Sequence, residues 1–257
     1  MVHIDSRAVI HPKAELGENV TVAPFAIIGE DVKIGDNTYI GPNVFIDKWV
    51  TIGKNNKIYN GTIIGTPPQD VKYTDTKTYV RIGDNNIIRE YVTINRGTME
   101  ESATEIGNNN YLMIMTHVPH NCKIGNNVTL INLTGICGHV ILEDNCVVSG
   151  LSGIHQYCRV GKFAMVGGHS KVVKDVPPFI MVDGNPARVR GLNLVGLKRN
   201  NFSDDEISNL KKAYKIIFMG TQTFEEATRT LKDELSGDKN VMYLIEFLQN
   251  SERGFTR

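Results

Sequence analysis

The 257-residue chain lacks several features that mark common classes of protein. Its formal net charge is zero, so no basic surplus indicates binding to nucleic acid or to an anionic membrane surface. None of its four cysteines forms a C-x-x-C pair, which disfavours zinc and disulfide roles. No apolar run approaches the roughly 18 residues of a membrane span, and the first residues do not resemble a signal peptide. We therefore expect a cytoplasmic protein without integral membrane contact or a nucleic-acid partner.

A six-residue period runs through most of the sequence. Every sixth residue from Ile4 to Val172 is Ile, Val or Leu, apart from Asp70, Thr76 and Glu100. This period is neither helical nor that of a plain alternating strand, and it predicts a solenoid with one short strand and one corner per hexad. In hexads such as Val32-Lys-Ile34-Gly-Asp-Asn the two apolar residues would point inward and Gly-Asp-Asn would turn the corner. Three hexads would close one triangular coil, so residues 18 apart would stack.

The hexads resemble those of hexapeptide-repeat proteins, whose fold is a left-handed parallel β-helix; the hand is implied by this resemblance alone. Cysteines at 122, 146 and 158 share an inward slot of the hexad, where we expect small buried thiols. Two polar stretches, about 66–79 and 97–105, interrupt the period but keep its phase, and we expect them to loop out of the coil. Such loops on a rigid scaffold often carry function.

The period changes near the C-terminus. Capping-box patterns, Ser203-Asp-Asp-Glu206 and Thr223-Phe-Glu-Glu226, predict two helices, the second of them broken at Gly237, and a third is expected from about Asn240. The predicted architecture is thus an all-β left-handed parallel β-helix over residues 1–190, followed by a small α-helical domain over 191–257. The helical part would pack on the end of the prism or on a neighbouring subunit.

Stacking of successive coils brings polar side chains together. Four of the seven histidines are predicted to meet on neighbouring coils, together with a glutamine, and this set comprises His117, His120, His139, His155 and Gln156. These histidines could be incidental, could bind a metal shared between subunits as in hexapeptide-fold carbonic anhydrases, or could supply a general base near neutral pH. Gly150 and Gly168 form a second column that would leave a shallow trough, although glycine is also a default corner residue.

Several segments carry a closer resemblance, and it spans essentially the whole chain. They are Pro68-Gln-Asp70, Ile88-Arg-Glu90, Asn95-Arg-Gly-Thr98, Gly138-His139, His155-Gln156, Asp175-Val-Pro-Pro178, Gly184-Asn185, Gly196-Leu-Lys-Arg199 and Asn250-Ser-Glu-Arg-Gly254. The chain resembles the acyl-[acyl-carrier-protein]–UDP-N-acetylglucosamine O-acyltransferases, which catalyse the first step of lipid A biosynthesis. The family resemblance implies transfer of a 3-hydroxyacyl chain from acyl carrier protein to the sugar 3-position in a homotrimer. It implies no cofactor, since phosphopantetheine arrives on the donor, and no metal.

The resemblance also implies residue roles. His120 would be the general base, and the backbone N–H of Gly138 would stabilise the oxyanion. Gly150 and Gly168 would line the acyl groove. The residues implied in substrate binding are Gln69, Asp70, Lys72, His117, His139, His155, Gln156, Asn193 and Arg199. We further expect the acidic carrier to dock on basic residues near the end of the prism, namely Arg159, Lys162, Lys171 and Lys174.

The sequence departs from the family pattern at a few positions. Residue 121 is Asn where the family commonly has Asp, and Val195, Asn200 and Pro186 replace Glu, Arg and His of other members. A neutral amide beside His120 would leave a weaker base, which raises the alternative of a more nucleophilic 3-amino sugar acceptor and an amide product. The sequence also leaves open the related N-acyltransferase of the same pathway, a metalloenzyme of the carbonic anhydrase type and a purely structural solenoid.

Overall fold

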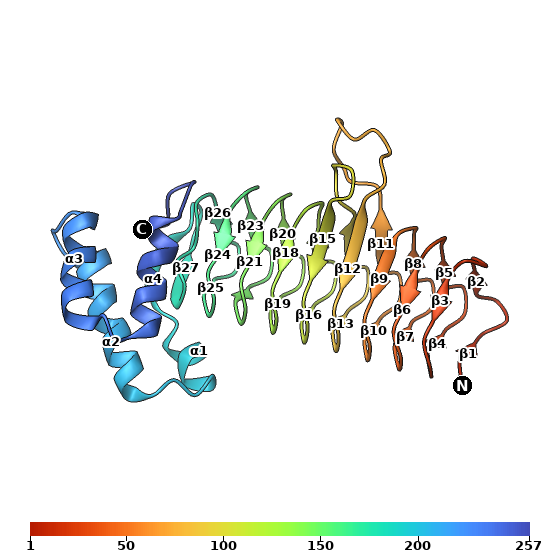
Figure 1. Ribbon diagram of the computed structural model, residues 1–257, viewed down its shortest axis with the longest axis horizontal. Helices are drawn as coiled ribbons and strands as arrows, with labels where there is room; N and C mark the ends of the chain where they lie inside the picture. Colours follow the sequence, from red (N-terminus) through yellow and green to blue (C-terminus); the bar gives the residue numbers. More distant parts are fainter.

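The computed structural model describes all 257 residues, and its first part is a triangular β-helix of three parallel sheets (Figure 1). We call them sheets A, B and C. Consecutive strands visit the three sheets in turn, so each sheet pairs strands one coil apart. Sheet A contains β1 (His3–Ile4), β4 (Thr21–Val22), β7 (Tyr39–Ile40), β10 (Lys57–Ile58), β13 (Ile87–Ile88), β16 (Tyr111–Leu112), β19 (Thr129–Leu130), β22 (Val147–Val148), β25 (Met165–Val166), β27 (Ile180–Asp183) and β28 (Arg188–Leu192).

The other two sheets consist of equally short strands. Sheet B contains β2 (Val9–Ile10), β5 (Ile27–Ile28), β8 (Phe45–Ile46), β11 (Ile63–Thr66), β14 (Thr93–Asn95), β17 (His117–Val118), β20 (Gly135–Ile136), β23 (Gly153–Ile154) and β26 (Lys171–Val172). Sheet C contains β3 (Glu15–Leu16), β6 (Lys33–Ile34), β9 (Val50–Ile52), β12 (Tyr79–Ile82), β15 (Ala103–Ile106), β18 (Lys123–Ile124), β21 (Ile141–Leu142) and β24 (Arg159–Val160). The predicted solenoid is confirmed.

The aliphatic residues of the six-residue period form the interior. From Val22 to Val172 these side chains are almost fully buried, and they pack with the inward residues two positions earlier in one 40-residue core. Cys122, Cys146 and Cys158 lie in this core as free thiols, as expected, whereas Cys137 is exposed. Each coil covers the apolar surface of the coil next to it. A single repeat cannot bury its own apolar surface, so the repeats are stable only as a stack.

The three corners of the prism differ in sequence although they share one backbone conformation. The third residue after most of the inward aliphatic residues has a positive φ, as Asn37 does at 58°. At the corner between sheets C and A this residue is Asn in seven coils, which suits the left-handed conformation. At the other two corners bulkier residues adopt it, including Leu133, His139 and Tyr157. The conformational preferences of such bulky residues disfavour a positive φ. A contact or a function outside the turn must therefore account for their presence at these corners.

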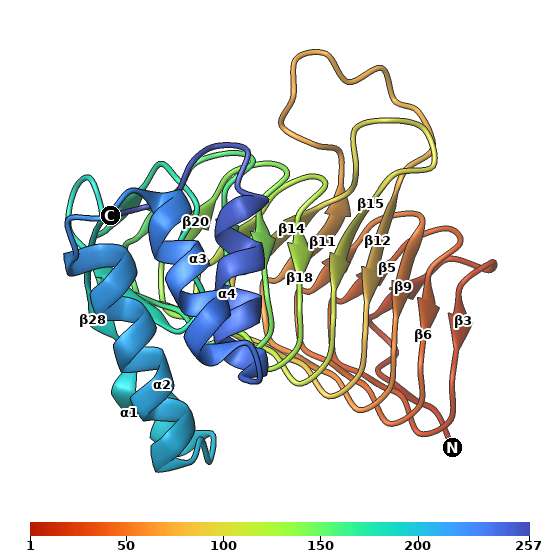
Figure 2. The same cartoon turned by 60° about the vertical axis from the view of Figure 1, so that its left-hand side comes forward.

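Both predicted insertions leave the prism at the corner between sheets B and C. The longer one joins β11 to β12 and the shorter one joins β14 to β15. Figures 1 and 2 show them rising side by side above the β-helix, in orange and yellow. The strands on either side keep their register: Ile64 pairs with Ile94, and Ile82 pairs with Ile106. The loops therefore add surface at one corner without disturbing the core.

The C-terminal part is helical, as predicted, and covers one end of the prism (Figure 2). It contains α1 (Leu194–Arg199), α2 (Asp204–Tyr214), a π-helical turn (Lys215–Met219), α3 (Phe224–Leu235) and α4 (Lys239–Gln249). Both expected capping boxes are present, at Ser203 and Thr223. Three features were not anticipated: helix α1, the π-helical turn and the antiparallel pairing of β27 with β28. None of the helices is long and apolar enough to cross a membrane.

Candidate active site

The predicted histidine cluster lies at the corner between sheets B and C, the corner that carries both insertions. His117 points outward from β17, and His120 follows in the turn after that strand. The rings of His120 and His139 meet edge to face, with their centroids 5.3 Å apart. His155 and Gln156 lie on the next coil, where both are exposed. Nowhere in the chain do three or more His, Cys, Asp or Glu side chains converge as metal ligands.

Asn121 determines which nitrogen of His120 carries the proton. The Asn121 Oδ1 atom accepts hydrogen bonds from the Thr98 backbone N–H at 3.2 Å and from the Thr98 hydroxyl at 2.8 Å. The same oxygen lies 3.0 Å from His120 Nδ1. Because a carbonyl oxygen can only accept, Nδ1 must be the protonated nitrogen of the neutral ring. The other nitrogen, Nε2, then has a free lone pair and can take a proton from a substrate.

Gly138 packs directly against this ring. A Cβ at residue 138 would overlap Cε1 of His120 and would lie 2.6 Å from its Nε2 atom. No hydrogen bond within the chain uses the backbone N–H of Gly138. Since unpaired buried N–H groups are rare in folded chains, this donor is available for an acceptor that enters the site. A base and a free N–H donor therefore lie next to each other.

The neighbouring histidines are held neutral at pH 7. Burial lowers the pKa of His117, and the nearby His120 lowers it further. The Thr93 hydroxyl lies 2.7 Å from His117 Nδ1. Burial also lowers the pKa of His139, with a further contribution from His120, while the carboxylate of Asp70 opposes the change. The long insertion leaves the prism at this same corner, since it joins β11 of sheet B to β12 of sheet C. Neutral rings bind polar ligands without adding charge beside His120.

The loop residues expected to bind substrate are accessible. Gln69 and Lys72 are exposed and Asp70 is half-buried. The Asp70 carboxylate accepts a hydrogen bond from the backbone N–H of Lys72 at 2.9 Å, which forms a tight turn at that point of the loop. These side chains thus project from the same corner as the histidines.

The two groove glycines differ in their surroundings. A Cβ on Gly168 would meet only the backbone oxygen of Gly150, at an ordinary contact distance of 3.6 Å, whereas a Cβ on Gly150 would lie 2.9 Å from the backbone oxygen of Asn132. Both lie at the corner between sheets A and B, and sheet B separates them from His120. The outward face of sheet B between the two corners has its own glycines, because Gly135 and Gly153 pair in register and nothing lies within 4 Å of either missing Cβ. A bare strip therefore connects the histidine corner with Gly168.

Sequence reasoning missed this strip and also missed Tyr157. The ring of Tyr157 stacks on His139 with centroids 4.7 Å apart. The sequence contains both signals, because Gly153 follows Gly135 by one full coil and Tyr157 follows His139 by the same interval. Applying the stacking rule to every column, rather than to histidines and corner glycines alone, would have found them.

The residues expected to bind the nucleotide lie elsewhere. Asn193 caps helix α1, and its side chain accepts from Gly196 N at 3.1 Å and donates to Phe163 O at 2.9 Å. It is buried in this role, while Arg199 is exposed in the last turn of α1. In Figure 1 this helix lies at the opposite edge of the molecule from the two insertions. One chain therefore does not bring these residues next to His120.

Two of the basic residues expected to meet a carrier protein are engaged within the chain. Arg159 pairs with Glu143 at 3.0 Å and lies 4.3 Å from the centre of the Phe247 ring. Lys162 lies over the ring of Tyr243 at 3.6 Å. These contacts join the β-helix to α4, so both residues are structural here. Lys171 and Lys174 are exposed as expected.

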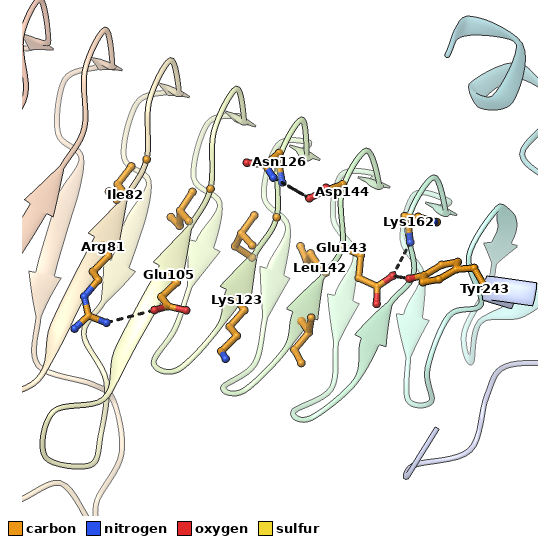
Figure 3. A pocket seen from close by; sticks show the side chains of 16 residues that line it. Arg81, Ile82, Glu105, Lys123, Asn126, Leu142, Glu143, Asp144, Lys162 and Tyr243 are labelled. Atoms are coloured by element: carbon orange, nitrogen blue, oxygen red, sulfur yellow. Dashed lines mark hydrogen bonds and ion pairs between the residues drawn. The ribbon is translucent and has the colours of Figure 1, made fainter. Parts of the chain in front are cut away.

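A large groove of the molecule is separate from the histidine corner. It is a groove of about 690 Å³ on the outer face of sheet C (Figure 3). The Arg81–Glu105 ion pair lies at one end, and Glu143, Lys162 and Tyr243 close the other. The groove follows from the junction with α4 and contains none of the predicted catalytic or sugar-binding residues.

Comparisons with known proteins show which family the chain is similar to. Residues 175–256 match the family model for the second domain of UDP-N-acetylglucosamine O-acyltransferase, and residues 31–66 match the model for bacterial transferase hexapeptide repeats. An acyl-[acyl-carrier-protein]–UDP-N-acetylglucosamine O-acyltransferase of Pseudomonas putida is 46% identical, with 100% of each chain covered. One from Gloeothece citriformis is 49% identical over 76% of this chain and 71% of the relative.

Solved structures give the same result. The UDP-N-acetylglucosamine acyltransferase of Francisella novicida has a TM-score of 0.95 at 39% identity, covering 99% of this chain and 94% of the other. The Arabidopsis enzyme has a TM-score of 0.88 at 36% identity, covering 99% and 100%. Since a relative that is 46% identical aligns over the whole of both chains, the chain belongs to the acyl-[acyl-carrier-protein]–UDP-N-acetylglucosamine O-acyltransferase family.

Proposed function

We propose that this chain transfers a 3-hydroxyacyl group from acyl carrier protein to the 3-hydroxyl of UDP-N-acetylglucosamine, with His120 as the general base. The observation that carries the proposal is that two unused groups lie next to each other. One is the free Nε2 lone pair of His120, and the other is the Gly138 backbone N–H, which makes no hydrogen bond within the chain. Membership of an acyltransferase family favours this interpretation over the metalloenzyme and purely structural alternatives.

The reaction follows from these two groups. His120 Nε2 takes the proton of the sugar hydroxyl as its oxygen attacks the thioester carbonyl carbon. The carbonyl oxygen becomes an oxyanion, which the Gly138 N–H stabilises by a hydrogen bond. When the C–S bond breaks, the pantetheine sulfur leaves and takes the proton from the imidazolium. The products are the 3-O-acyl sugar nucleotide and the free carrier thiol, so no other reactant is needed.

The remaining site residues bind the two substrates. Gln69, Asp70 and Lys72 would contact the sugar from their loop. His117, His139, His155 and Gln156 would surround the reacting groups. Asn193, through its cap on α1, and the exposed Arg199 serve the nucleotide, since a guanidinium matches phosphate geometry. The bare strip of Gly135, Gly153 and Gly168 would take the acyl chain, because each leaves room beside the backbone.

A homotrimer completes this site. The corner between sheets A and B carries large apolar residues that are about half exposed, which is costly unless a partner covers them. They are Phe25 (54%), Tyr91 (51%), Met115 (49%), Leu133 (47%) and Leu151 (52%), and we call them the apolar ridge. Since α1 and His120 lie apart within one chain, a neighbouring copy would supply Arg199 to the histidine corner.

The carrier protein would dock on exposed basic residues near the end of the prism. Lys174 lines a groove of about 580 Å³ together with Arg188 and Arg257, and Lys171 lies close by in the sequence. Acyl carrier proteins are acidic, so charge complementarity would speed their encounter. Reversing the charge of Lys174 should raise the KM for the carrier thioester and leave the KM for the sugar nucleotide unchanged.

The direct test is the activity of a His120→Ala variant on acyl carrier thioester and UDP-N-acetylglucosamine. Loss of a general base should reduce kcat by about 10² to 10⁴-fold while the protein stays folded. His3→Ala, a change of an exposed histidine far from the site, is the matched control. Full activity of His120→Ala would show that His120 is not the general base. A wild-type protein without acyl transfer activity would instead favour the structural alternative.

A second acceptor has one observation in its favour. Asn121 presents a neutral amide oxygen to His120, where a carboxylate would stabilise the imidazolium. A 3-amino sugar nucleotide is more nucleophilic and needs less help from the base. Comparing kcat/KM on 3-hydroxy and 3-amino acceptors decides between them, and a strong preference for the hydroxyl would reject the amide-forming alternative.

A further inference from the structure

We propose that the segment Asn95-Arg96-Gly97-Thr98 positions both halves of the active site. In this arrangement Asn95, Arg96 and Gly97 hold the 67–78 loop over the histidine corner, and Thr98 fixes the hydrogen bond between Asn121 and His120. The inference rests on the proposed function, which makes the 67–78 loop the sugar-binding half of the site and His120 with Asn121 its catalytic half. The contacts themselves do not depend on it.

Arg96 is the anchor of the long loop. Its side chain is only 1% exposed. Within the loop, its guanidinium pairs with Asp75 at 3.2 Å, and its Nε–H donates to the Tyr73 hydroxyl at 3.2 Å. Toward the prism, it pairs with Asp47 at 3.0 Å and donates to the backbone oxygen of Gly65 at 2.7 Å. The planar guanidinium thus binds loop and prism at once, which a single ammonium could not do.

The residues beside Arg96 hold the two ends of the same loop. The Asn95 side-chain amide donates to the Thr66 hydroxyl at 2.9 Å and to the Pro67 backbone oxygen at 3.1 Å, where the loop begins. The Gly97 backbone N–H donates to Tyr79 O at 3.4 Å, where the loop ends. A side chain at residue 97 would overlap Ser102, so only glycine permits this close packing. The start, middle and end of the loop are therefore all held by three consecutive residues.

Thr98 acts on the other half. Its backbone N–H and its hydroxyl both donate to Asn121 Oδ1. The Asn121 backbone N–H is in turn held by the Thr104 hydroxyl at 2.9 Å. With the amide oxygen fixed in this way, His120 must present Nδ1–H to it and keep Nε2 free. Thr98 touches no reacting atom and is a positioning residue for the base.

The first test uses Arg96→Lys in the full-length enzyme. Lysine keeps the charge but cannot reach all four partners, so the loop should loosen while the fold remains. Trypsin should cleave at the exposed Lys72 and Lys77 faster than in wild type, and kcat/KM for the sugar nucleotide should fall by about 10²-fold. The KM for the carrier thioester should not change. Arg81→Lys, which alters an exposed arginine on sheet C, is the matched control.

Asp75→Asn tests the same loop anchor independently, in case Arg96→Lys does not fold. The Asp75 side chain is 70% exposed, so its change leaves the core intact while it removes one anchor of the loop. It should shift the cleavage rate and kcat/KM for the sugar nucleotide in the same direction as Arg96→Lys, by a smaller factor. If the folded variants retain wild-type cleavage rates and wild-type kcat/KM for the sugar nucleotide, Arg96 does not position the loop and the proposal fails.

The second test uses Thr98→Val with Thr98→Ser as the conservative variant. Valine removes the hydroxyl donor, so kcat should fall about tenfold with both KM values unchanged, and serine should restore it. Nitrogen-15 NMR of labelled histidine should show one tautomer of His120, protonated at Nδ1, in wild type and a mixture in Thr98→Val. A single tautomer in Thr98→Val would overturn this arm.

These readouts separate the two proposals. Loop cleavage and the histidine tautomer can be measured without any substrate. If they change as expected but the wild-type enzyme does not acylate the sugar nucleotide, the proposed function is wrong and the positioning role stands. If wild type is active but neither readout responds, the positioning role is wrong and the proposed function stands.

Discussion

Gly138 and His120 pack so closely that no side chain fits between them. Gly138→Ala keeps the backbone N–H but forces the imidazole away from its position. We expect kcat to fall by about 10²-fold with the KM for both substrates nearly unchanged, because a displacement of about 1 Å of a catalytic group has this effect. Steady-state kinetics would measure it. Gly237→Ala, which meets no atom within 4 Å, should have wild-type activity; equal activity of the two variants would contradict the close packing.

The lowered pKa of His117 predicts a pH dependence of stability. The folded chain binds this proton less readily than the unfolded chain, whose histidines titrate near 6.5. The unfolded state therefore gains protons first as the pH drops, and the contribution to stability is complete above about pH 6.5 and is lost below it. Thermal melting at pH 7 and pH 5 should show a smaller loss for His117→Asn than for wild type. His3→Asn should behave as wild type, and an equal loss in all three would contradict the prediction.

Single residues were predictable where the stacking rule alone determines position. His120 and His139 meet because successive coils place them nearly one above the other. The hydrogen bonds of Asn121 were not predictable, because Thr98 reaches it from an insertion that has no period. Arg96 could not be interpreted for the same reason, since its four partners come from three parts of the sequence: Asp47, Gly65, and the loop residues Tyr73 and Asp75.

The inward slot at the corner between sheets C and A contains a ladder of asparagines. Asn86 donates to Asn56 Oδ1 and to the Gly107 backbone oxygen, and its own Oδ1 accepts from the Asn110 backbone N–H at 2.9 Å. All three asparagines are buried. Asn86→Val would leave the Gly107 backbone oxygen and the Asn110 backbone N–H without this partner, while Asn56 Oδ1 keeps the backbone N–H of residue 86. The expected cost is about 2 kcal/mol.

Urea or thermal unfolding would measure that loss. The control is Cys146→Val, an apolar exchange of similar size in the same column of the prism, which should cost less than about 1.5 kcal/mol. A loss for Asn86→Val no larger than that of the control would mean that the ladder does not stabilise the stack.

The elements were predictable to different degrees for physical reasons. The strands and their register follow from the aliphatic period, since a shift would expose the core. Helices α2 and α3 were found because capping boxes mark their starts. Helix α1 has no such signal: it is six residues long and begins with a buried Asn193 whose cap depends on contacts with Phe163. Its position is set by tertiary packing.

The apolar ridge predicts how the whole molecule assembles. Leu133 adopts a positive φ with its side chain 47% exposed, an arrangement that a bulky residue rarely takes without a compensating contact. Leu133→Glu should convert the proposed trimer to monomers and abolish activity, because a charge would be buried at the proposed interface. Analytical ultracentrifugation would show the change of mass. Met219→Glu, at a 70% exposed position of the helical domain, should remain trimeric; a trimeric Leu133→Glu would place the interface elsewhere.

A site shared between copies makes a stricter prediction. His120→Ala and Arg199→Ala should each be nearly inactive alone, yet they damage opposite sides of the same interface. If the two are unfolded together in equal amounts and refolded, about a quarter of the interfaces in a random mixture should pair an intact His120 with an intact Arg199 from the neighbour. Activity should recover to that fraction of wild type and should not recover when the folded trimers are mixed without exchange. No recovery after refolding would mean that both residues act within one chain, against the separation of α1 from the histidine corner in Figure 1.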